Sequence, residues 1–231
     1  MKNSAKLLLE FSIILGIFTL TTTYIVSTTS GRVAPFIPII SEMPFSEPEE
    51  SIFSTGLGIS LFGTFLVIQV LYRLFQPLAK NLGDFYVKGA RISWIAATIG
   101  SICGIITVSF NWKEFPLLHG ITAFTLFTTY LVTSTFSYDL MRKNNLDNNI
   151  RKYALVAGWF FYIMMAVFSV LDNLDMLEKR DDFFHRMENP PDVNTERSVY
   201  LNLTALCEWA MVFSFYLNFS TYREFIKNEK I

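Results

Sequence analysis

Residues 7–27 read LLLEFSIILGIFTLTTTYIVS and carry a single charged side chain, that of Glu10. A helix needs about 20 mostly apolar residues to cross the hydrocarbon core of a bilayer, and this stretch meets that length. It also exceeds the roughly 7–15 apolar residues of a cleaved signal peptide. We therefore predict a retained first transmembrane helix at residues 7–28.

Five further stretches have the same character, each with one charged side chain or none. They cover residues 52–75, 92–110, 116–138, 153–171 and 199–219. Lipid offers no partner to an unpaired backbone group, so each stretch is predicted to be a helix. The chain, residues 1–231, is thus predicted to be a single all-α domain: a polytopic membrane protein built as a bundle of six transmembrane helices.

Lysines and arginines are unevenly shared between the connecting segments, with roughly two on the side of the termini for each one on the other side. This bias predicts that both termini are cytosolic. The formal net charge is −1 and no basic patch stands out, so a nucleic-acid partner is not expected.

Two further features concern packing and the first loop. The second stretch carries Gly56, Gly58 and Gly63, and small residues at such spacing allow neighbouring helices to approach closely. The loop 29–51 is rich in proline and acids, but its apolar side chains predict that it folds back onto the membrane face.

Glu208 interrupts the last apolar stretch, 204-TALCEWAMVFSFYLNFS-220. It lies about 13 Å below the outer end of that helix, at 1.5 Å per residue. A charge at that depth costs about 3 kcal/mol, so the carboxyl is expected to be neutral and to face the bundle interior. Polar residues at matching depth are its predicted partners: Ser60, Ser101, Thr125 and Tyr162. Two interpretations stay open, a neutral acid that ties helices together and a functional group that handles a proton or a lipid headgroup.

His119 opens the fourth stretch, about 10 Å shallower than Glu208 by the same helical rise. One interpretation is an interfacial histidine bonded to an outer loop, with Glu42 as a candidate partner. The other places His119 with Glu208 in an outward-facing cavity. Glu208, His119 and Glu42 are therefore the candidate functional residues.

The usual catalytic patterns do not occur in this sequence. It contains no HxxxH, no GxSxG and no glycine-rich phosphate loop. The second histidine, His185, lies near Asp181 and Asp182 in a loop, which favours a solvated side chain over a metal ligand. We therefore expect no catalytic residue, no metal and no cofactor, and we predict that the protein is not an enzyme.

Three short motifs carry a resemblance to a known family. The first loop contains ISE, at residues 40–42, followed by PEESIF; a histidine, His119, opens the fourth stretch; and LCEW occupies residues 206–209 of the sixth. Together with six spans, they resemble the damage-regulated autophagy modulator (DRAM) family, within the wider Frag/DRAM/Sfk group. Two departures are extra residues before the ISE motif and threonines in place of a glutamine in the fourth stretch.

The resemblance implies a non-catalytic multi-pass membrane protein that regulates or scaffolds autophagy at lysosomal or other endomembranes, with the plasma membrane as the alternative location. Its partners would be the lipid bilayer, other membrane proteins or specific lipids. The alternative function, also suggested by relatives in the group, is lipid handling: GPI-anchor remodelling or phosphoinositide regulation through an outer-leaflet cavity with His119 and Glu208. An ion or proton pathway centred on Glu208 is a third hypothesis.

Overall fold

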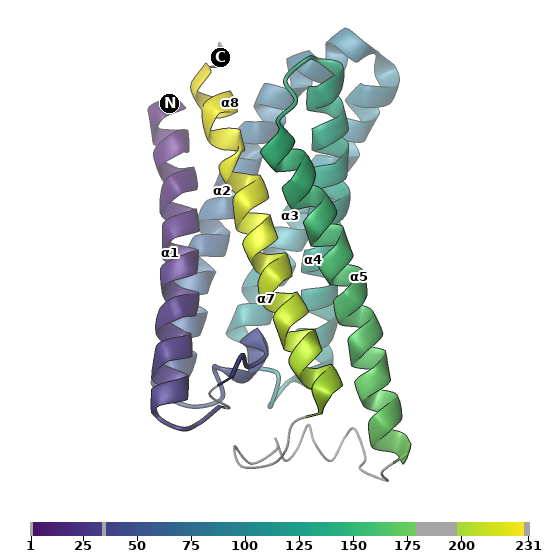
Figure 1. Ribbon diagram of the computed structural model, residues 1–231. Helices are drawn as coiled ribbons and strands as arrows, with labels where there is room; N and C mark the ends of the chain where they lie inside the picture. Colours follow the sequence, from purple (N-terminus) through teal and green to yellow (C-terminus); the bar gives the residue numbers. More distant parts are fainter. Residues whose placement is uncertain (1, 34–35, 179–197, 229–231) are drawn as a thin grey trace.

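The computed structural model describes residues 2–33, 36–178 and 198–228, and in these residues the chain forms helices and no strands. This confirms an all-α architecture (Figure 1). The long helices are α1 (Lys2–Thr29), α2 (Glu49–Leu82), α3 (Asp84–Ser109), α4 (Pro116–Lys143), α5 (Asn149–Glu178) and α7 (Val199–Ser220). Two short helices are η1 (Ile40–Glu42), a 3₁₀ turn, and α8 (Tyr222–Asn228). The predicted loop histidine, His185, lies outside the described residues.

Five of the described helices, α1 to α5, are long and apolar enough to cross a membrane. The chain is therefore a polytopic membrane protein. The helix that bears Glu208, α7, is shorter at 22 residues and also carries Asn202 and Asn218. Its place in the bundle follows from its packing, because α7 runs alongside α5 for much of its length (Figure 1).

The bundle has two distinct ends (Figure 1). Both termini lie at one of them, here called the terminal end. The first loop and η1 lie at the opposite one, here called the loop end. The closest helix pairs are α1 with α2, α2 with α3, α3 with α4 and α5 with α7. The sequence prediction that the terminal end is cytosolic stays a prediction.

The helices extend past the apolar stretches at the terminal end. Helix α2 runs through Pro77 to Leu82, whereas its apolar stretch was predicted to end at residue 75. Hydropathy marks only the part of a helix immersed in lipid, and backbone hydrogen bonding continues beyond it. Gly83 alone joins α2 to α3, with a φ of 99° that an L side chain rarely adopts.

Two apolar clusters lie at opposite ends of the bundle. The larger, at the terminal end, packs α1, α2 and α4 against α8, with Leu9, Leu140 and Ile226 fully buried. The smaller, at the loop end, joins Leu20 of α1 and Phe53 of α2 to the loop residue Met43. A cavity lies between the two clusters and reaches into both, because Leu20 of the smaller cluster and Phe219 of the larger one line it.

Candidate functional site

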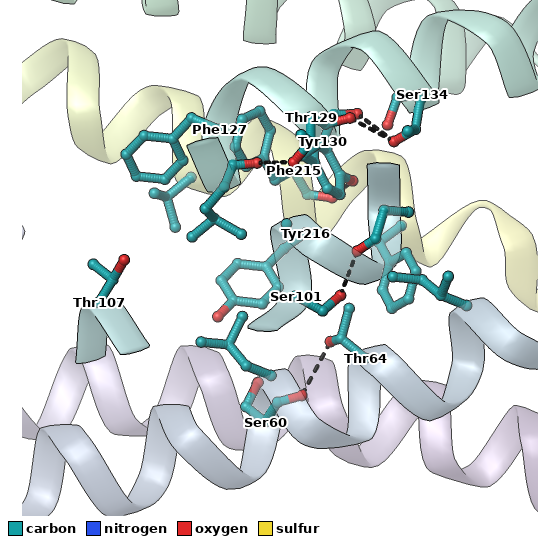
Figure 2. Close-up of a pocket in the computed structure, with 18 of the residues that line it drawn as sticks. Ser60, Thr64, Ser101, Thr107, Phe127, Thr129, Tyr130, Ser134, Phe215 and Tyr216 are labelled. Carbon is teal, nitrogen blue, oxygen red and sulfur yellow. Dashed lines mark hydrogen bonds between the residues drawn. The ribbon is translucent and has the colours of Figure 1, made fainter. Parts of the chain in front are cut away.

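The cavity has a volume of about 230 Å³ and lies between α2, α3, α4 and α7 (Figure 2). Ile40 and Ser41, from the loop and η1, line its loop end, and Tyr222 of α8 lines its terminal end. On α4 the lining residues recur at helical spacing from His119 to Ser137. This stripe is about 27 Å long at 1.5 Å per residue, so the cavity is elongated along the bundle axis.

Many lining residues carry hydroxyls, and several of these hydroxyls are turned back to their own helices. Ser101 donates to Ala97 O at 2.8 Å, and Thr64 donates to Ser60 O at 3.0 Å (Figure 2). Serine and threonine in a helix commonly bond the carbonyl one turn earlier. The remaining lining is aromatic and aliphatic, so the middle of the cavity presents a mostly apolar wall.

Glu208 lines the cavity at its loop end, where η1 meets α7. Its Oε2 accepts a hydrogen bond from Ile40 N at 2.6 Å. The next residue, Trp209, donates from Nε1 to Pro38 O at 2.8 Å. Two consecutive residues of α7 therefore hold the loop over the cavity, and they satisfy backbone groups that a lipid surface would leave unpaired.

Glu42 is the second carboxyl at this place. It is 7% exposed, and its Oε2 accepts from Ile39 N at 3.0 Å. The two carboxyls accept from consecutive N–H groups of the loop, Glu42 from Ile39 and Glu208 from Ile40. Two of the three candidate residues are therefore brought together by the loop, although they are far apart in the sequence.

The predicted hydroxyl partners of Glu208 bond elsewhere, which corrects that part of the prediction. Ser101 bonds within its own helix, as described above. Ser60 donates to Ser12 O at 2.7 Å, and Thr125 donates to Ile121 O at 2.8 Å. The hydroxyl of Tyr162 pairs with Thr128 Oγ1 at 2.6 Å. Only Ser60 and Ser101 share the cavity with Glu208. Nearby carbonyls satisfy the serine and threonine hydroxyls and Thr128 satisfies that of Tyr162, whereas the carboxyl accepts from a backbone N–H of the first loop.

His119 also lines the cavity, and it is 8% exposed. Its Nδ1 lies 2.9 Å from Phe110 O, a carbonyl that can only accept, so we assign the proton to Nδ1. The ring thus joins the start of α4 to the turn after α3. One interpretation predicted a bond from His119 to a connecting loop, and the acceptor is the backbone of Phe110, at the start of the turn between α3 and α4.

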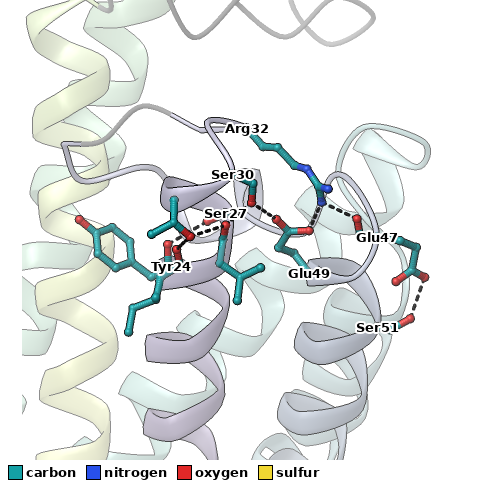
Figure 3. A network of polar contacts seen from close by, with 10 residues as sticks. Tyr24, Ser27, Ser30, Arg32, Glu47, Glu49 and Ser51 are labelled. Atoms are coloured by element: carbon teal, nitrogen blue, oxygen red, sulfur yellow. Dashed lines mark hydrogen bonds and ion pairs between the residues drawn. The ribbon is translucent and has the colours of Figure 1, made fainter.

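A polar network that the sequence did not predict fixes the first loop at the loop end (Figure 3). Glu49 is fully buried at the start of α2 and pairs with Arg32. Arg32 also donates to Glu47 O, and Ser30 donates to Glu49 at 3.1 Å. The sequence does show one arginine, Arg32, before the acid-rich start of the second helix. Because Arg32 and Glu49 lie 17 residues apart, sequence reasoning did not pair them.

We predict that Trp209→Phe loosens the first loop without unfolding the bundle. The change removes the donor to Pro38 O, a bond worth about 0.5–1.5 kcal/mol. Amide hydrogen exchange in residues 36–46 should accelerate by about two- to tenfold. Trp159→Phe is the matched control, because Trp159 donates to Thr135 of α4 instead. Equal exchange in both variants would show that Trp209 does not hold the loop.

Comparison with known proteins places these features in a family context. Residues 4–227 match the family described as Frag1/DRAM/Sfk1/Cwh43P N-terminal domain. DNA damage-regulated autophagy modulator protein 1 of Homo sapiens is 27% identical over 208 residues, covering 86% of this chain and 81% of that protein. The protein of that name from Xenopus laevis is 26% identical over 205 residues, with the same two coverages. No solved structure matches the chain.

Proposed function

Because the chain belongs to the Frag1/DRAM/Sfk1/Cwh43P family, we propose that it is a non-catalytic, multi-pass membrane protein that modulates autophagy from lysosomal or other endomembranes. Support comes from relatives that carry the name of DNA damage-regulated autophagy modulators and align over most of the chain. The same relatives are not named as enzymes, which agrees with a regulatory role.

A second function, lipid handling, is favoured by one observation: the elongated cavity is lined by both His119 and Glu208. A protein that acted only as a scaffold would be expected to fill its core with side chains, since protein interiors are close-packed. An elongated apolar space with a carboxyl at one end suits an amphiphile. The lipid function therefore concerns what the protein binds while it modulates autophagy.

Both candidate groups of the cavity are bonded to the backbone. Nδ1 of His119 is bonded to the Phe110 carbonyl, and Oε2 of Glu208 is bonded to Ile40 N. These bonds orient both groups, and the choice between binding and chemistry follows the relatives, which are named as autophagy modulators. We therefore favour a lipid-responsive regulator over a lipid-remodelling enzyme.

Rescue of autophagic flux tests both functions together. Cells that lack the protein are expected to show reduced flux after DNA damage or starvation, and the wild-type chain should restore it. Val212→Trp fills the cavity from α7 and should fail to restore flux. Val156→Trp is the control, because Val156 lies on the outer face of α5 with 59% exposure. Flux would be followed by turnover of a lysosome-delivered reporter.

Each outcome of the rescue bears on one function. Unchanged flux in cells that lack the protein would overturn the autophagy function. Full rescue by Val212→Trp, at normal abundance and location, would overturn a role for the cavity and leave a scaffold.

A further inference from the structure

The shape of the cavity restricts what it can hold. Its lining follows four helices: Phe53 to Phe75 on α2, Ala90 to Val108 on α3, His119 to Ser137 on α4 and Glu208 to Phe219 on α7. The α2 stripe extends about 33 Å and the α4 stripe about 27 Å. An extended aliphatic chain fits such a space better than a compact ring system.

In the middle of the cavity, a bound molecule needs no polar group to satisfy the lining residues. Hydroxyls such as those of Thr129 and Ser101 are satisfied by their own helices, and Tyr130 donates to Phe215 O at 2.8 Å across the bundle. An aliphatic chain prefers such a wall to water by about 0.8 kcal/mol per methylene group, so it can leave the bilayer for this cavity without exposure to water. The chain of a bound amphiphile would therefore lie here, along the axis.

The residues at the loop end of the cavity determine which charge the head group of a bound amphiphile can carry. Among the described lining residues, Glu208 carries the one carboxyl, and the carboxyl of Glu42 lies at the same η1 turn. The described lining residues include no lysine or arginine, and Arg32, at the same end, is paired with Glu49. An ammonium can pair with the Glu208 carboxyl and favour its ionised form, whereas a phosphate or carboxylate head finds no cation among these lining residues.

We propose that the cavity binds a single-chain lipid with a protonated amine head, placed so that the amine meets Glu208 and the chain runs toward Tyr222. This deepens the lipid function and rests on it. The loop residues 38–42, held by Glu208 and Trp209, cover the amine. A ligand amine would compete with Ile40 N for the Glu208 carboxyl, so occupancy is coupled to the position of the loop.

Three probes of equal chain length separate head chemistry from chain burial: hexadecylamine, hexadecanol and palmitate. Binding to the purified full-length protein in nanodiscs would be measured by native mass spectrometry and by thermal shift. The amine is expected to bind at least about tenfold more tightly than the alcohol, because a charge-assisted hydrogen bond exceeds a neutral one. Palmitate should bind most weakly.

Variants then locate the amine. Glu208→Gln keeps an oxygen that can accept from Ile40 N, so the loop stays in place. It should bring the amine to within about twofold of the alcohol while leaving the alcohol unchanged. Glu114→Gln, on the exposed turn before α4, is the control and should change neither. Val212→Trp and Ala97→Phe, from opposite walls, should weaken all three probes.

The outcomes distinguish the two levels of the proposal. In one outcome, all three probes bind equally and their binding is lost in both cavity-filling variants. That result would support lipid binding in the cavity and would contradict the proposed preference for an amine head group. Amine binding that persists in the cavity-filling variants would show partition into the bilayer and overturn the cavity site. Binding of no probe by the wild-type protein would overturn this inference and weaken the lipid function, while the autophagy function would still be judged by gene loss.

Discussion

Gly56→Leu is expected to lower the melting temperature of the protein in detergent by about 4–12 °C, because overpacking at a buried helix contact costs about 2–3 kcal/mol. Gly56 faces α1, and a Cβ at this position would overlap the side chain of Thr19. Thr19 is short, β-branched and 2% exposed, so it has no room to turn aside. The α1 and α2 backbones would have to separate.

The same substitution two residues away provides the control. A Cβ at Gly58 would meet nothing within 4 Å, so Gly58→Leu should leave the melting temperature within about 2 °C of wild type. Thermal unfolding of both variants, followed by circular dichroism, checks the difference. Equal melting temperatures would mean that the contact between α1 and α2 adjusts freely and that Gly56 is not required for it.

This pair of glycines shows how far sequence reasoning reaches. The spacing of Gly56, Gly58 and Gly63 correctly indicated close helix packing, because a Cβ at Gly63 would also meet α1, at Ser12. It did not show that Gly58 faces away, since the rotation of α2 depends on which neighbours surround it. Periodicity identifies a helix and its small residues, and the partner that each residue meets is a tertiary property.

The candidate site divides in the same way. Glu208 was singled out by the cost of a carboxyl in an apolar stretch, and the structure places it on a cavity with His119. Its partner could not be predicted, because the Glu208–Ile40 contact spans 168 positions and involves a backbone N–H that any residue would supply. The depth of Glu208 along its helix suggested that hydroxyls of neighbouring helices would be its partners. In the structure the first loop reaches down to the carboxyl and supplies the N–H of Ile40.

Arg151 is the clearest difference between sequence and structure. In the sequence it is one of the basic residues that orient the chain, which implies a solvated side chain, yet it is 2% exposed. Its Nε donates to Thr221 Oγ1 at 2.9 Å, and its Nη2 donates to Thr221 O at 3.2 Å. Its Cζ lies 4.7 Å from the centre of the Tyr222 ring. The guanidinium thus ties the start of α5 to the junction of α7 and α8.

Arg151→Met is expected to destabilise the protein by about 3 kcal/mol, because hydrogen bonds of a charged group contribute about 1.5–3 kcal/mol each. The melting temperature in detergent should fall by about 6–12 °C. Arg151→Lys should fall almost as far, since one ammonium cannot reproduce a planar fork that reaches a hydroxyl, a carbonyl and a ring. Arg142→Met is the control: Arg142 pairs with Asp139 at the surface, where an ion pair contributes about 0–1 kcal/mol.

The sign of the Arg151 effect is decided by desolvation. Among the described residues no carboxylate pairs with this guanidinium, so the bundle bears the cost of a buried charge without an opposite charge. If that desolvation cost exceeded the stabilisation from the hydrogen bonds of Arg151, the Arg151→Met variant would melt at or above the wild-type temperature. This result would contradict the prediction. The geometry argues against it, because the guanidinium donates to both the hydroxyl and the carbonyl of Thr221, and methionine offers a donor to neither. Removing Arg151 would therefore release the start of α5 from the junction at which α8 turns to cover the terminal end of the cavity.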